Sequence, residues 1–340
     1  MKQKIFIIAG PTASGKTAAA IGTAKLMNAE IISADSIQIY RGLDIGSAKP
    51  SVREQDGVPH HLIDCVDIAD GSFNVAMFRK CAIEKIHEIN SRGKNALIVG
   101  GTGLYINALT YPLNFSGAEP DAARREELSR MEDADPGCLH RMLEGIDPEK
   151  AARLHVNDRK RIIRAIEIFE QTGETASAHV GDFSNERGAE IEFDPVIAAL
   201  CFADREKLYD RIERRVDLML ENGLLDEVKA IAAKGYDRSL PALQGLGYKQ
   251  LLMYLDGEIS LDEAVELIKR DTRRFAKRQI SWFKRDKRIR NFYADLLTAE
   301  ELVQSLYEYF TNPNQWQENA RQTEQEDKQS LCTEKHTAIC

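Results

Sequence analysis

The chain lacks any long apolar run. Across its 340 residues, no apolar stretch approaches the roughly 20 residues that a membrane-spanning helix needs. The short apolar run at residues 5–9 leads straight into a glycine-rich segment, which is not the pattern of a secretory signal peptide. We therefore expect a cytoplasmic protein without a membrane anchor.

Cysteine is scarce and scattered. The six cysteines form no C-x-x-C pair and no cluster with the spacing of metal ligands. This distribution argues against a disulfide framework and against a zinc site, and it is typical of reduced thiols in a cytosolic protein.

The chain also lacks a net positive charge, since its formal charge is −8 at pH 7. A negative sum argues at first against a nucleic-acid partner, but the distribution of charge matters more than the sum. Residues 269–290 contain eleven Lys and Arg and only two Asp, and a second basic cluster lies at residues 153–164. Two segments of this acidic chain can therefore bind a polyanion.

A phosphate-binding motif follows the first apolar run. The segment GPTASGKT matches G-x-x-x-x-G-K-[ST] at every fixed position and opens a helix-prone run at residues 17–28. Small residues let backbone N–H groups converge on phosphate oxygens, and the helix N-terminus adds positive potential. Lys16 supplies a point charge, and the Thr17 hydroxyl suits Mg²⁺. The predicted phosphate or diphosphate site comprises Gly10, Pro11, Thr12, Ala13, Ser14, Gly15, Lys16 and Thr17.

Further apolar runs predict the fold class. They lie at residues 30–34, 95–99 and 196–202, and helical patterns separate them. Runs that are apolar on both faces suit a buried parallel sheet. The sequence therefore predicts an α/β fold, a doubly wound parallel sheet of the P-loop NTPase-like kind.

The pattern becomes charged, helical and strand-poor after about residue 115, and a sheet pattern resumes near Phe193. A Ser followed three residues later by Glu, at Ser260, predicts the start of a long helix that carries the basic segment. We expect a core with C-terminal helices at 1–115 and 193–311, a helical insertion domain at 116–192 and a disordered polar tail at 312–340.

The loops after the second and third apolar runs hold further candidate residues. Asp35 follows the second run, where α/β folds place functional side chains. A helix cap or loop carboxylate is the alternative, but the polar segment 35–41 beside the phosphate loop favours function. The third run ends in Gly100-Gly101-Thr102-Gly103, where a typical NTPase has an acid. The missing acid predicts a phosphate loop that does not hydrolyse a nucleotide.

Residues 272–284 interleave basic and aromatic side chains at helical spacing. The alternative interpretation is an amphipathic helix whose basic side is exposed to solvent and binds nothing. The density of charge, which continues to Arg290, favours contact with a phosphate backbone.

Together these motifs resemble the tRNA dimethylallyltransferase family, also called tRNA isopentenyltransferases or IPP transferases. The likeness spans the chain to about residue 290. It is carried by GPTASGKT (10–17), DSIQIYRGLDIGSAKP (35–50), PHHLID (59–64), GGTGLY (100–105), NDRKRIIRAIE (157–167), LYDRIERRVDLMLENGLLDEV (208–228), QGLGYK (244–249) and TRRFAKRQISWFK (272–284).

The resemblance implies a reaction and roles for residues. A dimethylallyl group would pass from dimethylallyl diphosphate to N6 of an adenine next to the tRNA anticodon, at position 37, with release of diphosphate. The phosphate loop would hold the diphosphate with Mg²⁺, and Arg211 is assigned to the same site. Asp35 would act as the base, with Lys16 and Thr17 as further catalytic groups.

The resemblance also implies an RNA partner, the anticodon stem-loop, bound by a protein that we expect to be a monomer. The insertion and the basic helix would clasp the stem-loop. Arg124 fits one of the family's tRNA contacts as well as its neighbour Arg125 does. The expected tRNA contacts are Asp35, Ser36, Ile37, Gln38, Thr102, Arg125, Lys160, Arg161, Arg164, Lys277 and Arg278.

Three rival functions remain at this point. An adenylate dimethylallyltransferase would use free AMP or ADP, for which two basic segments are unnecessary. A small-molecule kinase would use Asp35 to deprotonate a hydroxyl group. A non-catalytic RNA-binding protein would not need the intact Lys16, Thr17 and Asp35.

Overall fold

The computed structural model describes residues 2–113, 118–179 and 191–314. The chain divides into two compact units, one made of residues 1–109 and 192–340 and the other of residues 110–191. From residue 315 on, the expected polar tail lies outside the described residues.

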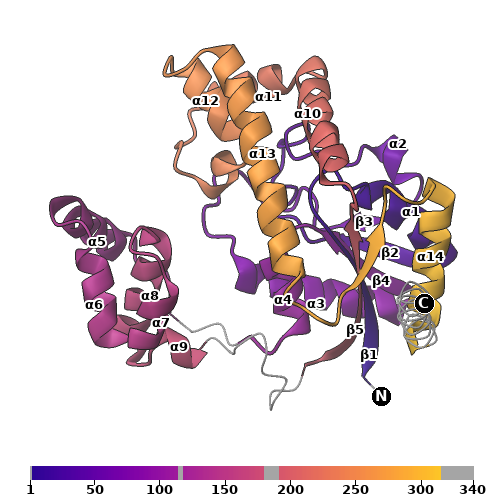
Figure 1. Ribbon diagram of the computed structural model, residues 1–340, viewed down its shortest axis with the longest axis horizontal. Helices are drawn as coiled ribbons and strands as arrows, with labels where there is room; N and C mark the ends of the chain where they lie inside the picture. The colour runs from indigo at the N-terminus through magenta and orange to yellow at the C-terminus, as the bar shows by residue number, and fades with distance from the viewer. Residues whose placement is uncertain (1, 114–117, 180–190, 315–340) are drawn as a thin grey trace, which may run out of the picture. The chain divides into compact units, whose positions relative to one another are not determined.

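The first unit is built on one parallel sheet (Figure 1). Its order is β3-β2-β4-β1-β5-β6, and every paired neighbour runs parallel. Ile7 in the central β1 lies beside Ile98 of β4 and Ile197 of β5. The strands are β1 (Gln3–Ala9), β2 (Ala29–Ser33), β3 (His60–His61), β4 (Asn95–Gly100), β5 (Phe193–Cys201) and β6 (Arg290–Tyr293).

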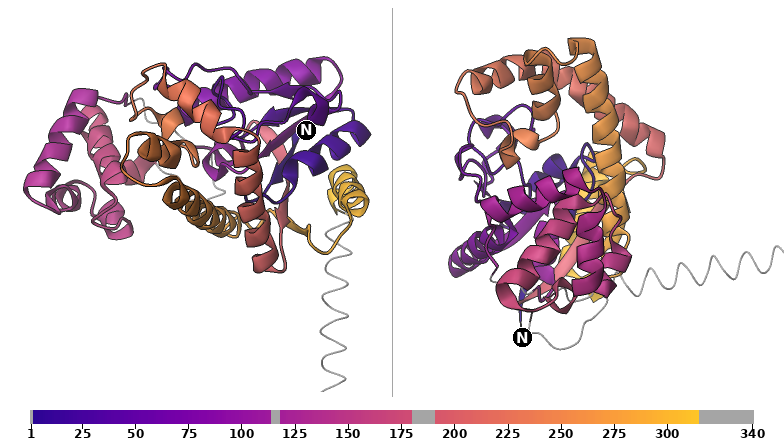
Figure 2. Two further views of the ribbon diagram at one scale, coloured as in Figure 1. Left: turned by 90° about the horizontal axis from the view of Figure 1, so that it is seen from above. Right: turned by 90° about the vertical axis from the view of Figure 1, so that its left-hand side faces the viewer.

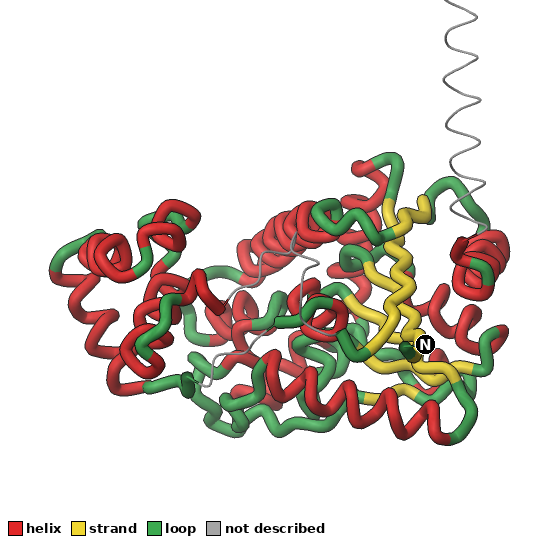
Figure 3. The backbone as a smooth tube through the Cα atoms, turned by 90° about the horizontal axis from the view of Figure 1, so that it is seen from below, coloured by secondary structure: helices red, strands yellow, loops and turns green. Residues whose placement is uncertain are grey.

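Helices cover both faces of this sheet, as the separate views show (Figures 2 and 3). On one face, α1 (Lys16–Leu26) packs beside α14 (Ala299–Thr311), and their apolar side chains share a core with Ile8. On the other face, α3 (Val75–Ser91) and α4 (Gly103–Thr110) enclose a second core. The predicted doubly wound α/β fold is therefore confirmed.

The later helices of this unit include the basic one. They are α10 (Arg205–Glu221), α11 (Leu224–Ala232), α12 (Tyr248–Leu255) and α13 (Leu261–Phe283), with a short α2 (Val52–Gln55) and a 3₁₀ turn at Pro241–Gln244 elsewhere. Ser260 caps α13 by accepting the Glu263 N–H, and the Glu263 carboxylate accepts the Ser260 N–H in return. The helix start predicted from this spacing is confirmed.

The second unit has an apolar core of its own. Its helices are α5 (Ala122–Ala134), α6 (Cys138–Ile146), α7 (Pro148–Arg153), α8 (Arg159–Thr172) and α9 (Ala176–His179). Leu128, Leu143 and Ile166 are fully buried where α5, α6 and α8 meet. Within the described ranges of both units, no helix is long and apolar enough to cross a membrane.

Candidate active site

Three loops meet at the carboxyl edge of the sheet. They follow β1, β2 and β4, which are neighbours in the sheet, so their ends lie side by side. The Thr102 N–H donates to the Ala34 carbonyl at 3.3 Å, and the Thr102 hydroxyl accepts the Ser36 N–H at 3.2 Å. The candidate residues Asp35, Ser36 and Thr102 are thereby brought together beside the phosphate loop.

The phosphate loop turns through left-handed backbone conformations. Ala13 has φ 62° and Gly15 has φ 89°, and such alternation directs successive N–H groups into one concave surface. A Cβ on Gly10 would lie 2.7 Å from the Leu200 carbonyl oxygen, so only glycine fits there. The Ser14 hydroxyl is buried and has no hydrogen-bond partner among the described residues. A buried hydroxyl without a partner in this loop suits a hydrogen bond to a bound ligand.

Three cations surround the loop. The Lys16 Nζ donates to the Pro11 carbonyl at 2.6 Å, and the Arg211 Nε donates to the Ala13 carbonyl at 2.9 Å. Arg215 lies one turn after Arg211 on the same side of α10, by i, i+4 spacing. It makes no hydrogen bond or ion pair with another described residue, and its pKa is lowered by burial. The basic side chains around the phosphate loop therefore outnumber the acidic side chains beside it.

Burial and the neighbouring positive charge lower the pKa of Lys16. Desolvation, and to a smaller extent the nearby Arg215, together lower the pKa of Lys16 from 10.5 to about 7, while Asp35 acts in the opposite direction. A bound anion would reverse the balance by favouring the charged ammonium. The loop is therefore electrostatically prepared for a phosphate or diphosphate group.

Asp35 presents one carboxylate oxygen to the site. Its Oδ1 accepts the N–H groups of Ile37 at 2.9 Å and Gln38 at 3.3 Å, which fixes the side chain in a local turn. No described residue bonds to Oδ2. The half-buried carboxylate is thus held by one oxygen and leaves the other to accept a proton.

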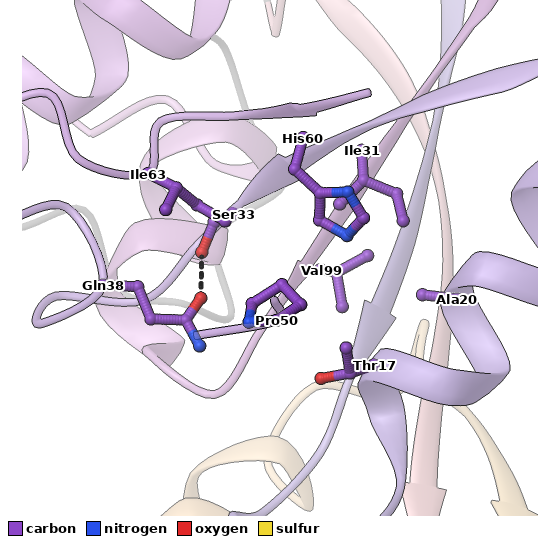
Figure 4. Close-up of a pocket in the computed structure, with 9 residues that line it drawn as sticks. All are labelled: Thr17, Ala20, Ile31, Ser33, Gln38, Pro50, His60, Ile63 and Val99. Carbon is purple, nitrogen blue, oxygen red and sulfur yellow. Dashed lines mark hydrogen bonds between the residues drawn. The ribbon is translucent and has the colours of Figure 1, made fainter. Parts of the chain in front are cut away.

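The Gln38 side chain is fully engaged within the loop after β2. Its oxygen accepts the Ser33 hydroxyl at 2.9 Å (Figure 4). Its nitrogen donates to the carbonyls of Ser47 and Ala48. A small pocket lies between this amide and the first turn of α1. Its lining is Thr17, Ala20, Ile31, Ser33, Gln38, Pro50, His60, Ile63 and Val99.

Within the described ranges, no three His, Cys, Asp or Glu side chains gather in a way that would hold a metal ion. The Thr17 hydroxyl lies exposed in the first turn of α1, beside the phosphate loop. Mg²⁺ commonly takes few protein ligands and completes its shell with phosphate oxygens and waters. The residues present therefore fit a Mg²⁺ ion that arrives with a diphosphate.

The charges on α13 separate into two halves. In the first half, Lys269 pairs with Asp217, and Arg273 pairs with Glu213. In the second half, the exposed Lys277 and Arg278 make no ion pair with a described residue. The Arg278 guanidinium lies over the Phe275 ring, with 5.8 Å from its central carbon to the ring centroid. The exposed Lys284 and Arg285 follow without ion pairs among the described residues.

The basic cluster of the second unit is divided in a similar way. Glu167 is buried on α8 and accepts two bonds from Arg125, at 2.7 and 2.8 Å, and one from Arg164 at 3.3 Å. Arg161 makes a loose contact with Asp158 at 3.5 Å, and Lys160 has no ion-pair partner among the described residues. Arg125 thus joins α5 to α8 through Glu167, and Arg164 contacts Glu167 within α8, whereas Lys160 and Arg161 face solvent.

Two residues of the site escaped the sequence analysis. Arg215 could have been found from its i, i+4 spacing to Arg211. Gln279 is buried on α13 and contacts two of the three loops, accepting the Thr12 N–H and donating to the Gly101 carbonyl. No local pattern indicates this contact, because 267 positions separate Gln279 from Thr12.

Comparison with known proteins identifies the family. The IPP transferase family model matches residues 38–286. This chain belongs to the IPP transferase family. It is 48% identical over 286 residues to a tRNA dimethylallyltransferase of Alkaliphilus oremlandii, and the alignment covers 84% of this chain and 90% of the relative. A second such relative, from Acetivibrio thermocellus, is 47% identical over 90% of this chain and 96% of its own.

Solved structures agree with this membership. The full-length tRNA isopentenylpyrophosphate transferase of Bacillus halodurans matches with a TM-score of 0.69 at 39% identity, covering 94% of this chain and all of that one. A eukaryotic dimethylallyltransferase acting on tRNA matches with a TM-score of 0.76 at 29% identity, covering 91% of this chain and 79% of that one. The predicted family resemblance is confirmed.

Proposed function

We propose that this protein is a tRNA dimethylallyltransferase. It transfers a dimethylallyl group from dimethylallyl diphosphate to N6 of the adenine at position 37, next to the anticodon. The observation that carries the proposal is a cationic phosphate loop beside the free carboxylate oxygen of Asp35, in a chain 48% identical to a relative of that name.

The donor half of the site stabilises a leaving group. The bond between C1 of the dimethylallyl group and the bridging oxygen breaks, and its electron pair leaves with the diphosphate. Lys16, Arg211 and Arg215 and the N–H groups of the loop favour the charge that develops there. The Ser14 hydroxyl supplies a further donor. No acid follows β4, so the loop binds a diphosphate without hydrolysing ATP.

The acceptor half supplies a base. The lone pair of an adenine N6 amine is delocalised into the ring, which makes the amine a poor nucleophile. As N6 bonds to C1, Asp35 takes a proton from N6 on its free oxygen. The target base must leave its stack to reach this site. Ser36, Ile37, Gln38 and Thr102 border the position that it would occupy.

The metal in this proposal is Mg²⁺, with Thr17 as its protein ligand. When bound, Mg²⁺ supplies additional neutralisation of the departing diphosphate. Thr17 lies in the first turn of the helix that the phosphate loop opens, where it would contact the same ligand as the N–H groups of the loop.

The RNA would be bound by exposed cations that have no acidic partner closer than 3.5 Å among the described residues. On α13 these include Lys277 and Arg278, and in the second unit Lys160 and Arg161. Arg125 and Arg164 contact Glu167 already, so we assign them a smaller share of the binding. We propose that the protein works as a cytoplasmic monomer.

One assay tests the function against its rivals. Radiolabelled dimethylallyl diphosphate, or ATP labelled at its γ-phosphate, is offered with AMP, with unmodified tRNA or with no acceptor. We expect label transfer only from dimethylallyl diphosphate and only to tRNA, without added ATP. Transfer to AMP alone would favour an adenylate dimethylallyltransferase. Phosphoryl transfer from ATP would favour a kinase, and tRNA binding without any transfer would leave an RNA-binding protein.

A further inference from the structure

Gln279 joins the donor loop to the acceptor loop. Its Oε1 accepts the Thr12 N–H at 2.9 Å, and its Nε2 donates to the Gly101 carbonyl at 2.9 Å. Only 7% of the residue is exposed. The amide side chain carries both the acceptor and the donor that this bridge needs, since Thr12 offers a donor and Gly101 an acceptor.

The loop held by Gln279 also holds the base. Gly101 precedes Thr102, whose hydroxyl accepts the Ser36 N–H next to Asp35. A Cβ on Gly101 would lie 2.2 Å from the Gln279 Nε2, so the loop approaches the amide as closely as a backbone can. Trp282, one turn further along α13, packs equally closely against Gly103. The contacts therefore run without a gap from the phosphate loop through Gln279 to the turn that carries Asp35.

We propose that Gln279 is a positioning residue that fixes the spacing between the phosphate loop and the Asp35 loop. In the transfer reaction this spacing sets how far the leaving diphosphate lies from the amine that Asp35 deprotonates. A misplacement of about 1 Å can cost on the order of 100-fold in rate. Gln279 itself touches no reacting atom. The inference rests on the proposed function, and its test below can fail separately.

A matched control exists in the same unit. Gln250 is also buried, at 5% exposure, and it also makes two hydrogen bonds. It accepts the Gly247 N–H at 3.0 Å and donates to Asp271 at 3.2 Å. The first bond caps the start of α12 and the second joins α12 to α13, and neither touches any of the three loops. Replacing either glutamine with methionine removes two hydrogen bonds of similar kind at similar volume.

The test compares Gln279→Met with Gln250→Met. We expect both to lower the melting temperature to a similar extent, and both to keep wild-type affinity for an anticodon stem-loop. Only Gln279→Met should slow single-turnover transfer, by about 10-fold to 100-fold. Its Thr12 amide should also exchange with deuterium faster than in the wild type. Equal transfer rates in the two variants, or an unchanged Thr12 exchange rate, would overturn the proposal.

A second variant covers the case in which Gln279→Met does not fold. In Gln279→Glu, the ionised carboxylate still accepts the Thr12 N–H but repels the Gly101 carbonyl. The protonated acid donates to that carbonyl and restores the bridge. The transfer rate relative to wild type should therefore rise as the pH falls, and a ratio independent of pH would contradict the bridge. Wild-type protein that transfers nothing would instead refute the proposed function, while the exchange measurement would still report on the bridge.

Discussion

At the scale of single residues, Lys16 gives the site a measurable response to its ligand. Because its pKa lies at about 7 in the free protein, Lys16 is largely neutral at pH 8. Bound diphosphate raises this pKa, so binding at pH 8 should take up close to one proton, and less at pH 6. Calorimetry of dimethylallyl diphosphate binding in two buffers of different ionisation enthalpy measures the uptake.

The control for proton uptake is Lys16→Met, which should bind the donor more weakly and lose the buffer dependence. Thr17→Ala should also weaken donor use but keep the proton uptake, because it leaves the ammonium in place. A binding enthalpy at pH 8 that is the same in both buffers for the wild type would show that Lys16 is already charged.

The same lowered pKa affects stability. Between pH 7 and the ordinary value of 10.5, the unfolded chain binds a proton at Lys16 that the folded chain does not. The free energy of unfolding therefore gains a contribution from this group as the pH rises through that window, and the gain is absent below pH 7. Lys16→Met should flatten this part of the stability profile, as measured by denaturant unfolding at pH 7 and pH 9.

At the scale of elements, α13 separates its paired charges from its unpaired ones. We expect the triple variant Lys277→Ala, Arg278→Ala, Lys284→Ala to weaken tRNA binding and to flatten the dependence of log affinity on log salt by roughly one unit per lost phosphate contact. Transfer at saturating stem-loop should survive better than binding, since these side chains do no chemistry. Binding titrations over a range of salt concentrations measure both quantities.

The first half of α13 provides a control of equal charge. Replacing Lys269, Arg270 and Arg273 with alanine removes the same number of positive charges, but these side chains contact acidic partners. It should change the salt slope less. Circular dichroism must first show that both variants are folded, because basic side chains also pack against helices. Equal slopes for both variants and the wild type would show that the basic side of α13 faces solvent and makes no contact with RNA phosphates.

The elements also mark how far the sequence could predict this structure. The phosphate loop, the position of Asp35 and the start of α13 depend on local patterns, so they could be predicted. The pairing of Lys269 and Arg273 with α10 depends on how two helices pack, which no local pattern encodes. The short edge strand β6 was missed because its Arg-Asn-Phe-Tyr sequence lacks an apolar run. The role of Gln279 was missed because its hydrogen-bond partners lie far away along the chain, where no local pattern indicates them.

At the scale of the whole molecule, the proposed function requires an acidic protein to bind an acidic ligand, and we propose that cations on both units contribute to this binding. If both units bind one tRNA, then Lys160→Ala with Arg161→Ala should weaken binding, and adding the α13 triple variant should weaken it further. Affinity measured for the separate and combined variants tests this. A combined variant no weaker than the α13 variant alone would exclude the second unit from RNA binding.

Arg125 and Arg164 should behave differently from Lys160 and Arg161. Removing both leaves the buried Glu167 carboxylate unpaired, which costs about 3 kcal/mol of unfolding free energy. We therefore expect Arg125→Ala with Arg164→Ala to lower the stability of the protein, as measured by denaturant unfolding. Undiminished stability together with lost tRNA affinity would instead make these two arginines direct RNA contacts.

The central claim is that Asp35 removes the proton while the phosphate loop holds the leaving group. The most direct measurement is single-turnover transfer from dimethylallyl diphosphate to a saturating anticodon stem-loop by wild type and Asp35→Asn, with stem-loop affinity measured in parallel. The amide keeps the turn that Asp35 forms but cannot accept the proton. We predict a loss of about 10²-fold to 10⁴-fold in rate with nearly unchanged affinity. A loss of less than about fivefold would remove Asp35 from the role of base.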